Sequence, residues 1–290
     1  MKLSPDSQQK IRKYFNKLSK KIFLKKDLDQ IINMNYQLWE LPSYDIDNYI
    51  DCLKKIELRE IILSSPNYDK KFTRFAWGEK AHVYELSLSI KPRSYFSHQT
   101  AMYLHGLTDK IPETIYVNSE QSPKQYRESS LEQERIDAAF KRKPRTSKFI
   151  FTYKKWMICL LNGINTDNLG VIEKKVPEEG KLSLTNIERT LIDIAVRPVY
   201  SGGCKDVVEA YERARNNVSV DRLVKMLKKI NYIYPYCQAI GFYMQRAGFD
   251  VSDLDKLRKF DNMKYDFYLD YDMKNTAYSE EWKLYYSKRL

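Results

Sequence analysis

Apolar residues in the first part of the chain recur every three or four positions, which is the spacing of an amphipathic helix. Ser4-Pro5 marks the start of a first helix, since serine is a favoured N-cap and proline fits the first turn. A second short helix is expected from about Asp27, and Ser43 is expected to cap a third. The inward residues of the three helices would be Ile11, Phe15, Leu18 and Ile22, then Leu28, Ile31 and Ile32, and then Ile46, Tyr49, Ile50 and Leu53.

The pattern then changes to one typical of strands. Residues 57–63 read as a strand, residues 64–69 supply turn formers, and 72–88 contains further strand candidates around Trp77-Gly78. Three short helices followed by a hairpin is the order of elements in a winged helix-turn-helix, whose third helix enters the major groove of DNA. A small three-helix interaction module is the alternative. Residues 1–90 are therefore predicted to form a winged helix-turn-helix DNA-binding domain.

A turn at Lys91-Pro92 separates this part from a larger second domain, residues 91–290. In it, Thr185-x-x-Glu188 fits a capping box that opens a helix. Further helices are expected over 97–107, 131–142, 205–216, 220–229 and 235–248 and from Ser252, and strands over 115–117, 149–153 and 265–271. Helices dominate with short strands between them. The predicted fold class is α+β, with an N-terminal winged helix-turn-helix followed by a larger mixed α/β domain.

Composition indicates a folded cytoplasmic protein, since 43% of the 290 residues are hydrophobic and only 9 are glycine. No run approaches the ~18 apolar residues of a membrane span, and the N-terminus lacks the apolar core of a signal peptide. The four cysteines lie far apart within or beside apolar runs, so buried structural thiols are expected rather than disulfides. His98 and His105 share a predicted helix face, but no third ligand is evident. Neither a metal nor a cofactor is expected.

The formal net charge of +12 suits a polyanionic partner, because lysine and arginine gain from releasing counterions bound to phosphates. The excess is spread along the chain, but two runs contain no acid, residues 10–26 and 141–155. A solvated surface is the alternative explanation for each run.

Within residues 1–90, the outward side of the third helix and the basic residues flanking it form the predicted DNA-binding surface. Asn48 is placed to pair with adenine, and the lysines are placed to reach phosphates. Asp45, Asp47 and Asp51 make the front of this helix acidic, although acids there also oppose the helix dipole. The predicted DNA-binding residues are Lys25, Lys26, Tyr44, Asn48, Lys54, Lys55, Arg59, Lys70, Lys71 and Arg74.

Three blocks of the larger domain resemble the AbiEi family of abortive-infection antitoxins. The first is Tyr95-Phe96-Ser97-His98-Gln99-Thr100-Ala101-Met102-Tyr103-Leu104-His105-Gly106-Leu107-Thr108-Asp109. The second is Glu188-Arg189-Thr190-Leu191-Ile192-Asp193, followed by Arg197-Pro198, Tyr200 and Gly202-Gly203. The third runs from Tyr234 to Tyr243 and has Cys237 where we expect a histidine. The residues that carry the resemblance are Ser97, His105, Gly106, Arg189, Asp193, Arg197, Tyr200, Gly202, Gly203 and Gln238.

The resemblance implies the antitoxin of a type IV toxin–antitoxin system for phage defence. Such a protein is a winged-helix transcriptional repressor that binds double-stranded DNA, as repeats in its own promoter. Its larger domain would serve both repression and the antagonism of a nucleotidyltransferase toxin, without a stable complex between the two proteins.

Several polar residues of the larger domain have alternative roles that the residue pattern leaves open. Arg189, Asp193 and Arg197 are spaced as an ion-pair ladder along one helix, and Gly202-Gly203 suits either an anion or a tight turn. No Ser-His-Asp order, phosphate loop or zinc pattern is present, so an enzyme is not expected. The alternative is a nucleic-acid or nucleotide-processing enzyme, which would need Asp266, Asp270 and Asp272 to meet a basic residue such as Lys148 in one cleft. An RNA-binding regulator is a third possibility.

Overall fold

The computed structural model describes residues 3–41, 45–69, 71–79, 83–123, 131–260 and 262–290. These residues form eleven α-helices and three sheets, so the chain is of the mixed α+β class. It divides into two compact units. Unit 1 comprises residues 1–94, 149–158 and 175–182, and unit 2 comprises 95–148, 159–174 and 183–290. Each unit has its own hydrophobic core.

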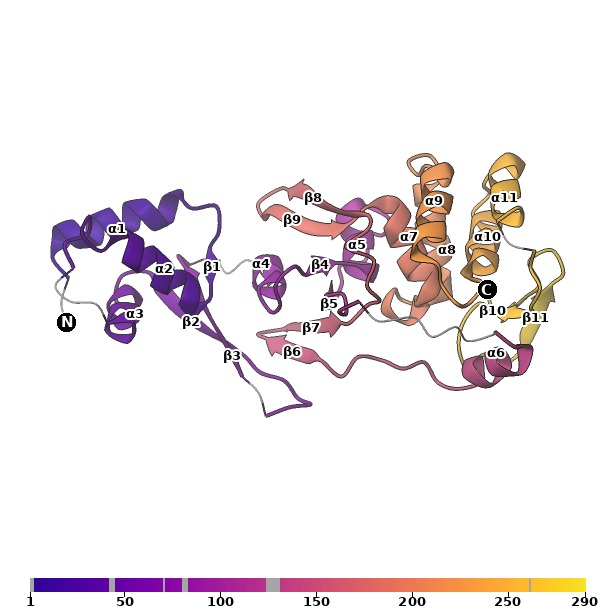
Figure 1. Cartoon of the computed structure of the whole chain (residues 1–290), viewed down its shortest axis with the longest axis horizontal. Coiled ribbons are helices and arrows are strands. Elements are labelled where there is room, and N and C mark those ends of the chain that lie inside the picture. The colour runs from indigo at the N-terminus through magenta and orange to yellow at the C-terminus, as the bar shows by residue number, and fades with distance from the viewer. Residues whose placement is uncertain (1–2, 42–44, 70, 80–82, 124–130, 261) are drawn as a thin grey trace. The chain divides into compact units, whose positions relative to one another are not determined.

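Unit 1 begins with three helices and a three-stranded antiparallel sheet of order β1-β3-β2 (Figure 1). In the register of the long hairpin, Leu58 lies opposite Trp77 and Leu63 lies opposite Phe72. The elements are α1 (Pro5–Lys17), β1 (Ile22–Phe23), α2 (Lys25–Asn35), α3 (Ile46–Lys54), β2 (Leu58–Leu63), β3 (Phe72–Trp77) and α4 (Val83–Leu88).

Local sequence explains most of these elements. Ser4 caps α1 by accepting the backbone N–H of Ser7, with Pro5 at the first helical position as expected. The third helix is capped by Asp45, which accepts two backbone N–H groups, whereas Ser43 lies outside the described residues. Two predictions were wrong: Ile22 lies on β1 and not on the first helix, which ends at Lys17, and residues 83–88 form helix α4 and not a strand. Glycine at position 78, with φ of 81°, ends the strand before it.

The core of unit 1 is built around Phe15. Its ring stacks on Trp77 at a centroid distance of 4.4 Å and meets Phe23 edge-on at 5.5 Å, so α1 is fixed against β1 and β3. The indole N–H of Trp77 donates to the side-chain oxygen of Asn16 at 2.8 Å. The predicted inward positions of α3, Tyr49, Ile50 and Leu53, are buried in the same core.

Unit 2 centres on a helical assembly in which α7, α8, α9, α10 and α11 pack on one another (Figure 1). The helices outside unit 1 are α5 (His98–His105), α6 (Gln133–Phe140), α7 (Ile187–Val196), α8 (Cys204–Ala214), α9 (Val220–Ile230), α10 (Tyr236–Arg246) and α11 (Val251–Arg258), with a 3₁₀ turn η1 (Pro198–Tyr200). The remaining strands of the chain, of which β6 and parts of β7, β8 and β9 belong to unit 1, are β4 (Tyr95–Phe96), β5 (Thr114–Asn118), β6 (Ile150–Tyr153), β7 (Trp156–Leu161), β8 (Val171–Val176), β9 (Gly180–Thr185), β10 (Phe267–Tyr268), β11 (Thr276–Ser279) and β12 (Leu284–Ser287).

Two sheets are formed by these strands. Six pair in the order β6-β7-β5-β4-β9-β8, and the short strands near the C-terminus pair as β10-β12-β11. The sequence pattern did not predict β4, β7, β8, β9, β11 or β12, and the strand expected over 265–271 is reduced to β10. The expected capping box is also displaced, because Asn186 and not Thr185 caps α7. Thr185 ends β9, and its hydroxyl bonds that of Thr190 at 2.8 Å.

No helix in the described ranges is long and apolar enough to cross a membrane. The four cysteines are not joined in disulfides, and Cys52, Cys159 and Cys237 are buried.

Candidate functional site

The exposed side of α3 in unit 1 is mixed in charge. Asp47, Asn48, Asp51, Lys54 and Lys55 all lie on it, as the helical spacing predicts. The arrangement therefore offers both hydrogen-bonding groups and cations on one helix surface.

Two of the predicted phosphate-binding lysines already have acidic partners. Lys25 Nζ, at the start of α2, lies 2.6 Å from Asp47 Oδ1 at the start of α3. Lys54 Nζ lies 2.6 Å from Glu60 Oε2 on β2 and 3.6 Å from Asp51. The hydrogen bond to Glu60 raises the pKa of Lys54. Because these pairs are accessible to solvent, each is weak and can exchange its acid for a phosphate at low cost.

The side chain of Asn48 is also engaged. Its amide Nδ2 donates to Asp45 Oδ2 at 2.6 Å, while the same carboxylate caps α3. To read an adenine, Asn48 must give up this contact. Both residues are exposed, so the cost is that of one solvent-accessible hydrogen bond.

Arg74 does not belong to an exposed surface, which corrects its prediction as a DNA contact. Its side chain is buried, and its guanidinium donates to the backbone carbonyls of Thr73, Ser89 and Ile90. Burial lowers the pKa of Arg74. Side chains alternate between the two faces of the sheet along β3, which gives the face on which Arg74 lies. That face is covered by α4 and the residues that follow it. The guanidinium therefore fixes the end of α4 to β3.

Arg59 is half-buried and also has an internal role. Its Nε donates to the carbonyl of Gly78 at 2.8 Å, and its Nη2 is buried with no hydrogen-bond partner among the described residues. Of the remaining predicted contacts, Lys26, Lys55 and Lys71 are exposed and form no ion pair with a described residue. Tyr44 and Lys70 lie outside the described residues.

In unit 2 the second block of the resemblance forms a buried polar network around Arg189. Arg189 Nε donates to Asp193 Oδ1 at 2.8 Å, and Nη1 donates to Thr166 Oγ1 and to the carbonyl of Leu169. The two side chains of the ion pair are only 3% and 8% exposed. Burial by itself disfavours the charged guanidinium, but Asp193 outweighs it and raises the pKa of Arg189.

Glu120 completes this network, and no sequence pattern pointed to it. Its carboxylate accepts the backbone N–H of Thr166 at 2.7 Å, that of Asn168 at 3.1 Å and the hydroxyl of Tyr95 at 3.0 Å. Burial would raise the pKa of Glu120, but the hydrogen bonds from Thr166 and Asn168 lower it overall. The network thus ties β4 and the 163–170 loop to α7.

The first block of the resemblance positions α5. Ser97 is fully buried, and its hydroxyl bonds His98 Nδ1 at 2.9 Å. His105 Nε2 lies 2.6 Å from the carbonyl of Thr185, so this histidine fixes the end of α5 to the end of β9. Gly106 ends α5 in the left-handed conformation, with φ of 72°. The two histidines have different partners, and no group of three metal-ligating side chains occurs in the part of the chain described.

Arg197 is not the third member of an ion-pair ladder. Its guanidinium lies over the ring of Tyr271, 5.2 Å from the centroid. Tyr200 accepts the backbone N–H of Ser147 at 2.9 Å and packs edge-on against His98. The arrangement therefore connects the chain around η1 to α5 and to the C-terminal part of unit 2.

Gly202 and Gly203 are used for loop geometry and not for an open anion site. Both have positive φ, 84° and 90°, which favours glycine. A Cβ at position 202 would overlap the carboxylate of Asp206, so an acid of the same helix already lies beside this helix start. An external anion would be repelled by Asp206.

Gln238 connects α10 to the C-terminal strands. Its Nε2 lies 3.0 Å from the carbonyl of Tyr265, 2.8 Å from that of Trp282 and 3.0 Å from that of Lys283. The nearby Gly241 leaves room for the Trp282 ring, since a Cβ there would overlap it. The third block of the resemblance is thus packed against the C-terminal segment around Trp282.

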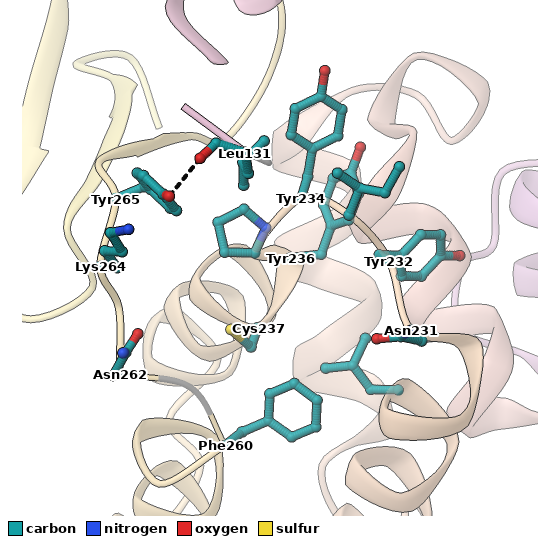
Figure 2. A pocket seen from close by; sticks show the side chains of 13 residues that line it. Leu131, Asn231, Tyr232, Tyr234, Tyr236, Cys237, Phe260, Asn262, Lys264 and Tyr265 are labelled. Atoms are coloured by element: carbon teal, nitrogen blue, oxygen red, sulfur yellow. Dashed lines mark hydrogen bonds between the residues drawn. The ribbon is translucent and has the colours of Figure 1, made fainter. Parts of the chain in front are cut away.

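A pocket of about 270 Å³ opens beside the start of α10 (Figure 2). Its wall is rich in aromatic rings, and Cys237, which stands where the resemblance leads us to expect histidine, lies in the wall. Tyr265 donates its hydroxyl to the carbonyl of Leu131 across one side. The lining residues are Leu131, Leu227, Asn231, Tyr232, Ile233, Tyr234, Pro235, Tyr236, Cys237, Phe260, Asn262, Lys264 and Tyr265.

The three aspartates required by the enzyme alternative have separate surroundings. Asp266 accepts the hydroxyl of Tyr278 at 2.6 Å, Asp270 lies 3.8 Å from Cys204 Sγ, and Asp272 is exposed. Burial raises the pKa of Asp270. These described residues form no shared carboxylate pair or cation site, so the geometry offers no support for that alternative.

Comparison with known proteins bears on the fold alone. No protein-family model matches the chain, and no curated protein matches it. Among solved structures, the crystal structure of RV2827C protein from Mycobacterium tuberculosis is similar, with a TM-score of 0.59 and 14% sequence identity. The likeness covers 97% of this chain and 91% of that chain. The α+β fold therefore has a solved counterpart of nearly the same extent.

Proposed function

We propose that the chain is a DNA-binding transcriptional repressor and the antitoxin of a type IV toxin–antitoxin system. It would bind double-stranded DNA in its own promoter, in the cytoplasm, and antagonise a nucleotidyltransferase toxin without a stable complex. The toxin part of the proposal rests on the three sequence blocks that resemble AbiEi antitoxins.

The observation that carries the DNA-binding part is the element order of unit 1. The order α1-β1-α2-α3-β2-β3, with β1 paired to β3 and an antiparallel β2–β3 hairpin, is typical of a winged helix-turn-helix. In this arrangement α3 is the recognition helix and the β2–β3 hairpin is the wing. The exposed side of α3 carries Asn48, Lys54 and Lys55, groups suited to base edges and phosphates.

The second unit supports a scaffolding role more than a catalytic one. The residues of the resemblance are largely buried and bond one another or backbone carbonyls, as Arg189, His105 and Gln238 do. We therefore propose that toxin antagonism depends on the surface of unit 2. The buried motif residues would support that surface and would not contact a partner themselves.

Salt-titrated binding to the gene's own upstream DNA, against a scrambled duplex of equal length, tests the proposal. A repressor binds its operator roughly 10³-fold or more above scrambled DNA. Equal binding to both duplexes that vanishes together as salt rises would contradict it, because only generic phosphate contact would remain.

A further inference from the structure

The β2–β3 hairpin is joined by a strand from much later in the chain. Thr152 on β6 pairs antiparallel with Ser64, just after β2. The backbone N–H of Thr152 donates to the carbonyl of Ser64 at 2.8 Å, and the two hydroxyls lie 3.0 Å apart. Residues 149–158 belong to unit 1, the same compact unit as the hairpin.

Two aromatic contacts strengthen this junction. The ring of Tyr68 stacks on Phe149 at a centroid distance of 5.3 Å, and Phe72 meets Phe151 edge-on at 5.1 Å. Phe151 is buried, whereas Tyr68 and Phe149 are 39% and 47% exposed, and each ring pair contributes beyond the surface that it buries. The far end of the hairpin is therefore fixed to β6 from both of its strands.

A two-residue turn follows β6. It lies at the end of the second acid-free basic run, residues 141–155, to which the proposed function assigns no role. Lys154 and Lys155 form this turn, and both are exposed. Their Nζ atoms lie over the neighbouring rings of Tyr153 and Trp156, at 5.5 and 5.2 Å from the centroids. Neither forms an ion pair with any residue that the structure describes. Two adjacent positive charges are thus exposed to solvent, and no acid among the described residues neutralises them.

The end of the β8–β9 hairpin, which is also assigned to unit 1, has the opposite character. Residues 175–182 carry Glu178 and Glu179 in their turn. A basic turn is therefore not a general property of the hairpins of this chain. It occurs on the strand that pairs with the β2–β3 hairpin.

We propose that the Lys154–Lys155 turn is a second contact to the phosphate backbone of double-stranded DNA, acting beside the β2–β3 hairpin. This inference rests on the proposed DNA-binding function. From Thr152 the chain runs antiparallel to β2, toward the end of β2 that follows α3. The turn contacts phosphates and reads no bases, since lysines on a hairpin turn offer charge without the bidentate geometry that base recognition needs.

Duplex DNA fits this surface better than single-stranded RNA. Recognition of single strands requires aromatic rings whose faces are open for stacking on bases. Here Tyr68 is stacked on Phe149, and the rings of Tyr153 and Trp156 lie under the two lysines. The rings of Tyr153 and Trp156 therefore support the lysines, and Tyr68 and Phe149 each cover one face of the other.

The test compares three forms of the full chain with the wild type in the same salt titration on upstream and scrambled duplex. The Lys154→Gln/Lys155→Gln variant removes both charges, and Lys154→Arg/Lys155→Arg keeps them. The matched control is Lys228→Gln/Lys229→Gln, which removes two adjacent exposed lysines of α9 in unit 2. Each phosphate contact contributes roughly 0.9 to the slope of log affinity against log salt. We expect the turn Gln variant to lose roughly 2 from the slope on both duplexes, and the Arg and control variants to keep the wild-type slope.

The other outcomes distinguish the phosphate contact of the turn from the proposed repressor function. A wild-type slope in the turn Gln variant, or an equal loss in the control, overturns the inference and leaves the proposed repressor intact. Wild-type protein that binds both duplexes equally overturns the repressor, while the slopes still decide the phosphate contact. Wild-type protein that binds neither duplex overturns both. Unchanged melting temperatures, expected because both lysines are exposed, show that the variants are folded.

Discussion

Arg189 and Asp193 form an ion pair one turn apart on α7, with Nε to Oδ1 at 2.8 Å and both side chains almost entirely buried. The pair is surrounded by further acceptors for the guanidinium, the hydroxyl of Thr166 and the carbonyl of Leu169. A buried pair of this kind is stable only because the desolvated charges are fully hydrogen-bonded. The contribution of the pair to the free energy of unfolding can therefore be measured by replacing one of its two residues.

Replacing Arg189 by alanine is expected to destabilise unit 2 strongly. The change leaves the Asp193 carboxylate buried without its cation and removes the donors to Thr166 and Leu169. Breaking a buried pair in this way costs about 3–5 kcal/mol. Urea unfolding of the wild type and the variant measures the difference. Arg213→Ala, which breaks the solvent-exposed ion pair with Asp109, is the control and should cost far less.

Acid is expected to destabilise the folded chain through His98. Burial lowers the pKa of His98 to about 4, whereas an unfolded histidine titrates near 6.5. Between these values the unfolded state binds the additional proton, so the free energy of unfolding falls as the pH falls from 6.5 toward 4. The free energy of unfolding falls by at most about 1.4 kcal/mol per pH unit, and the dependence is best measured between about pH 6.5 and 5, above most carboxylate titrations.

The matching variant is His98→Asn. Position 98 has a positive φ of 51°, which asparagine tolerates, and its side chain can still bond the Ser97 hydroxyl. Because asparagine does not titrate, the variant should show a shallower pH dependence in thermal or urea unfolding over this interval. A slope equal to that of the wild type would assign the acid sensitivity to other groups.

The sequence predicted the elements that depend on local pattern and missed contacts between distant segments. The α3 stripe of Tyr49, Ile50 and Leu53 follows from helical spacing alone. Arg74 was misplaced because alternation shows on which side of β3 it lies, while the cover on that side comes from α4. The contacts of Phe149 and Phe151 with the hairpin, and of Glu120 with the 163–170 loop, join segments whose pairing no local signal encodes.

Gly241→Ala is expected to destabilise the C-terminal end of unit 2. The added methyl would overlap the Trp282 ring, which is fully buried and has no free space to move into. Overpacking of this kind costs about 1–3 kcal/mol. The double variant Gly241→Ala/Trp282→Leu makes room for the methyl, so the two changes should be less than additive in urea unfolding. Strict additivity would mean that the two residues do not interact.

Reversing the charge of two α3-side lysines should abolish specific DNA binding without unfolding the protein. In the wild type, Asp47 and Glu60 pair with Lys25 and Lys54. The variant Lys25→Glu/Lys54→Glu therefore places a new carboxylate beside each of these two acids. The surface then repels phosphates at the helix that the proposed function assigns to the major groove. Affinity for upstream DNA should drop to that for scrambled duplex, while Lys228→Glu/Lys229→Glu keeps both. Unchanged affinity in a folded double variant would remove this face from the interface.

Residues 1–90 alone are expected to bind upstream DNA more weakly than the full chain. The fragment keeps α1 to α4 and the β2–β3 hairpin but lacks β6, so Tyr68 and Phe72 lose the rings of Phe149 and Phe151. A hairpin without this support is free to change its orientation and must be ordered on binding, which lowers affinity. In the full chain, Phe149→Ala/Phe151→Ala should reproduce part of the loss, whereas Phe260→Ala in the pocket wall of unit 2 should not. Fragment and full chain with equal affinity and equal cooperativity on the same duplex would show that the support from β6 is irrelevant to DNA binding.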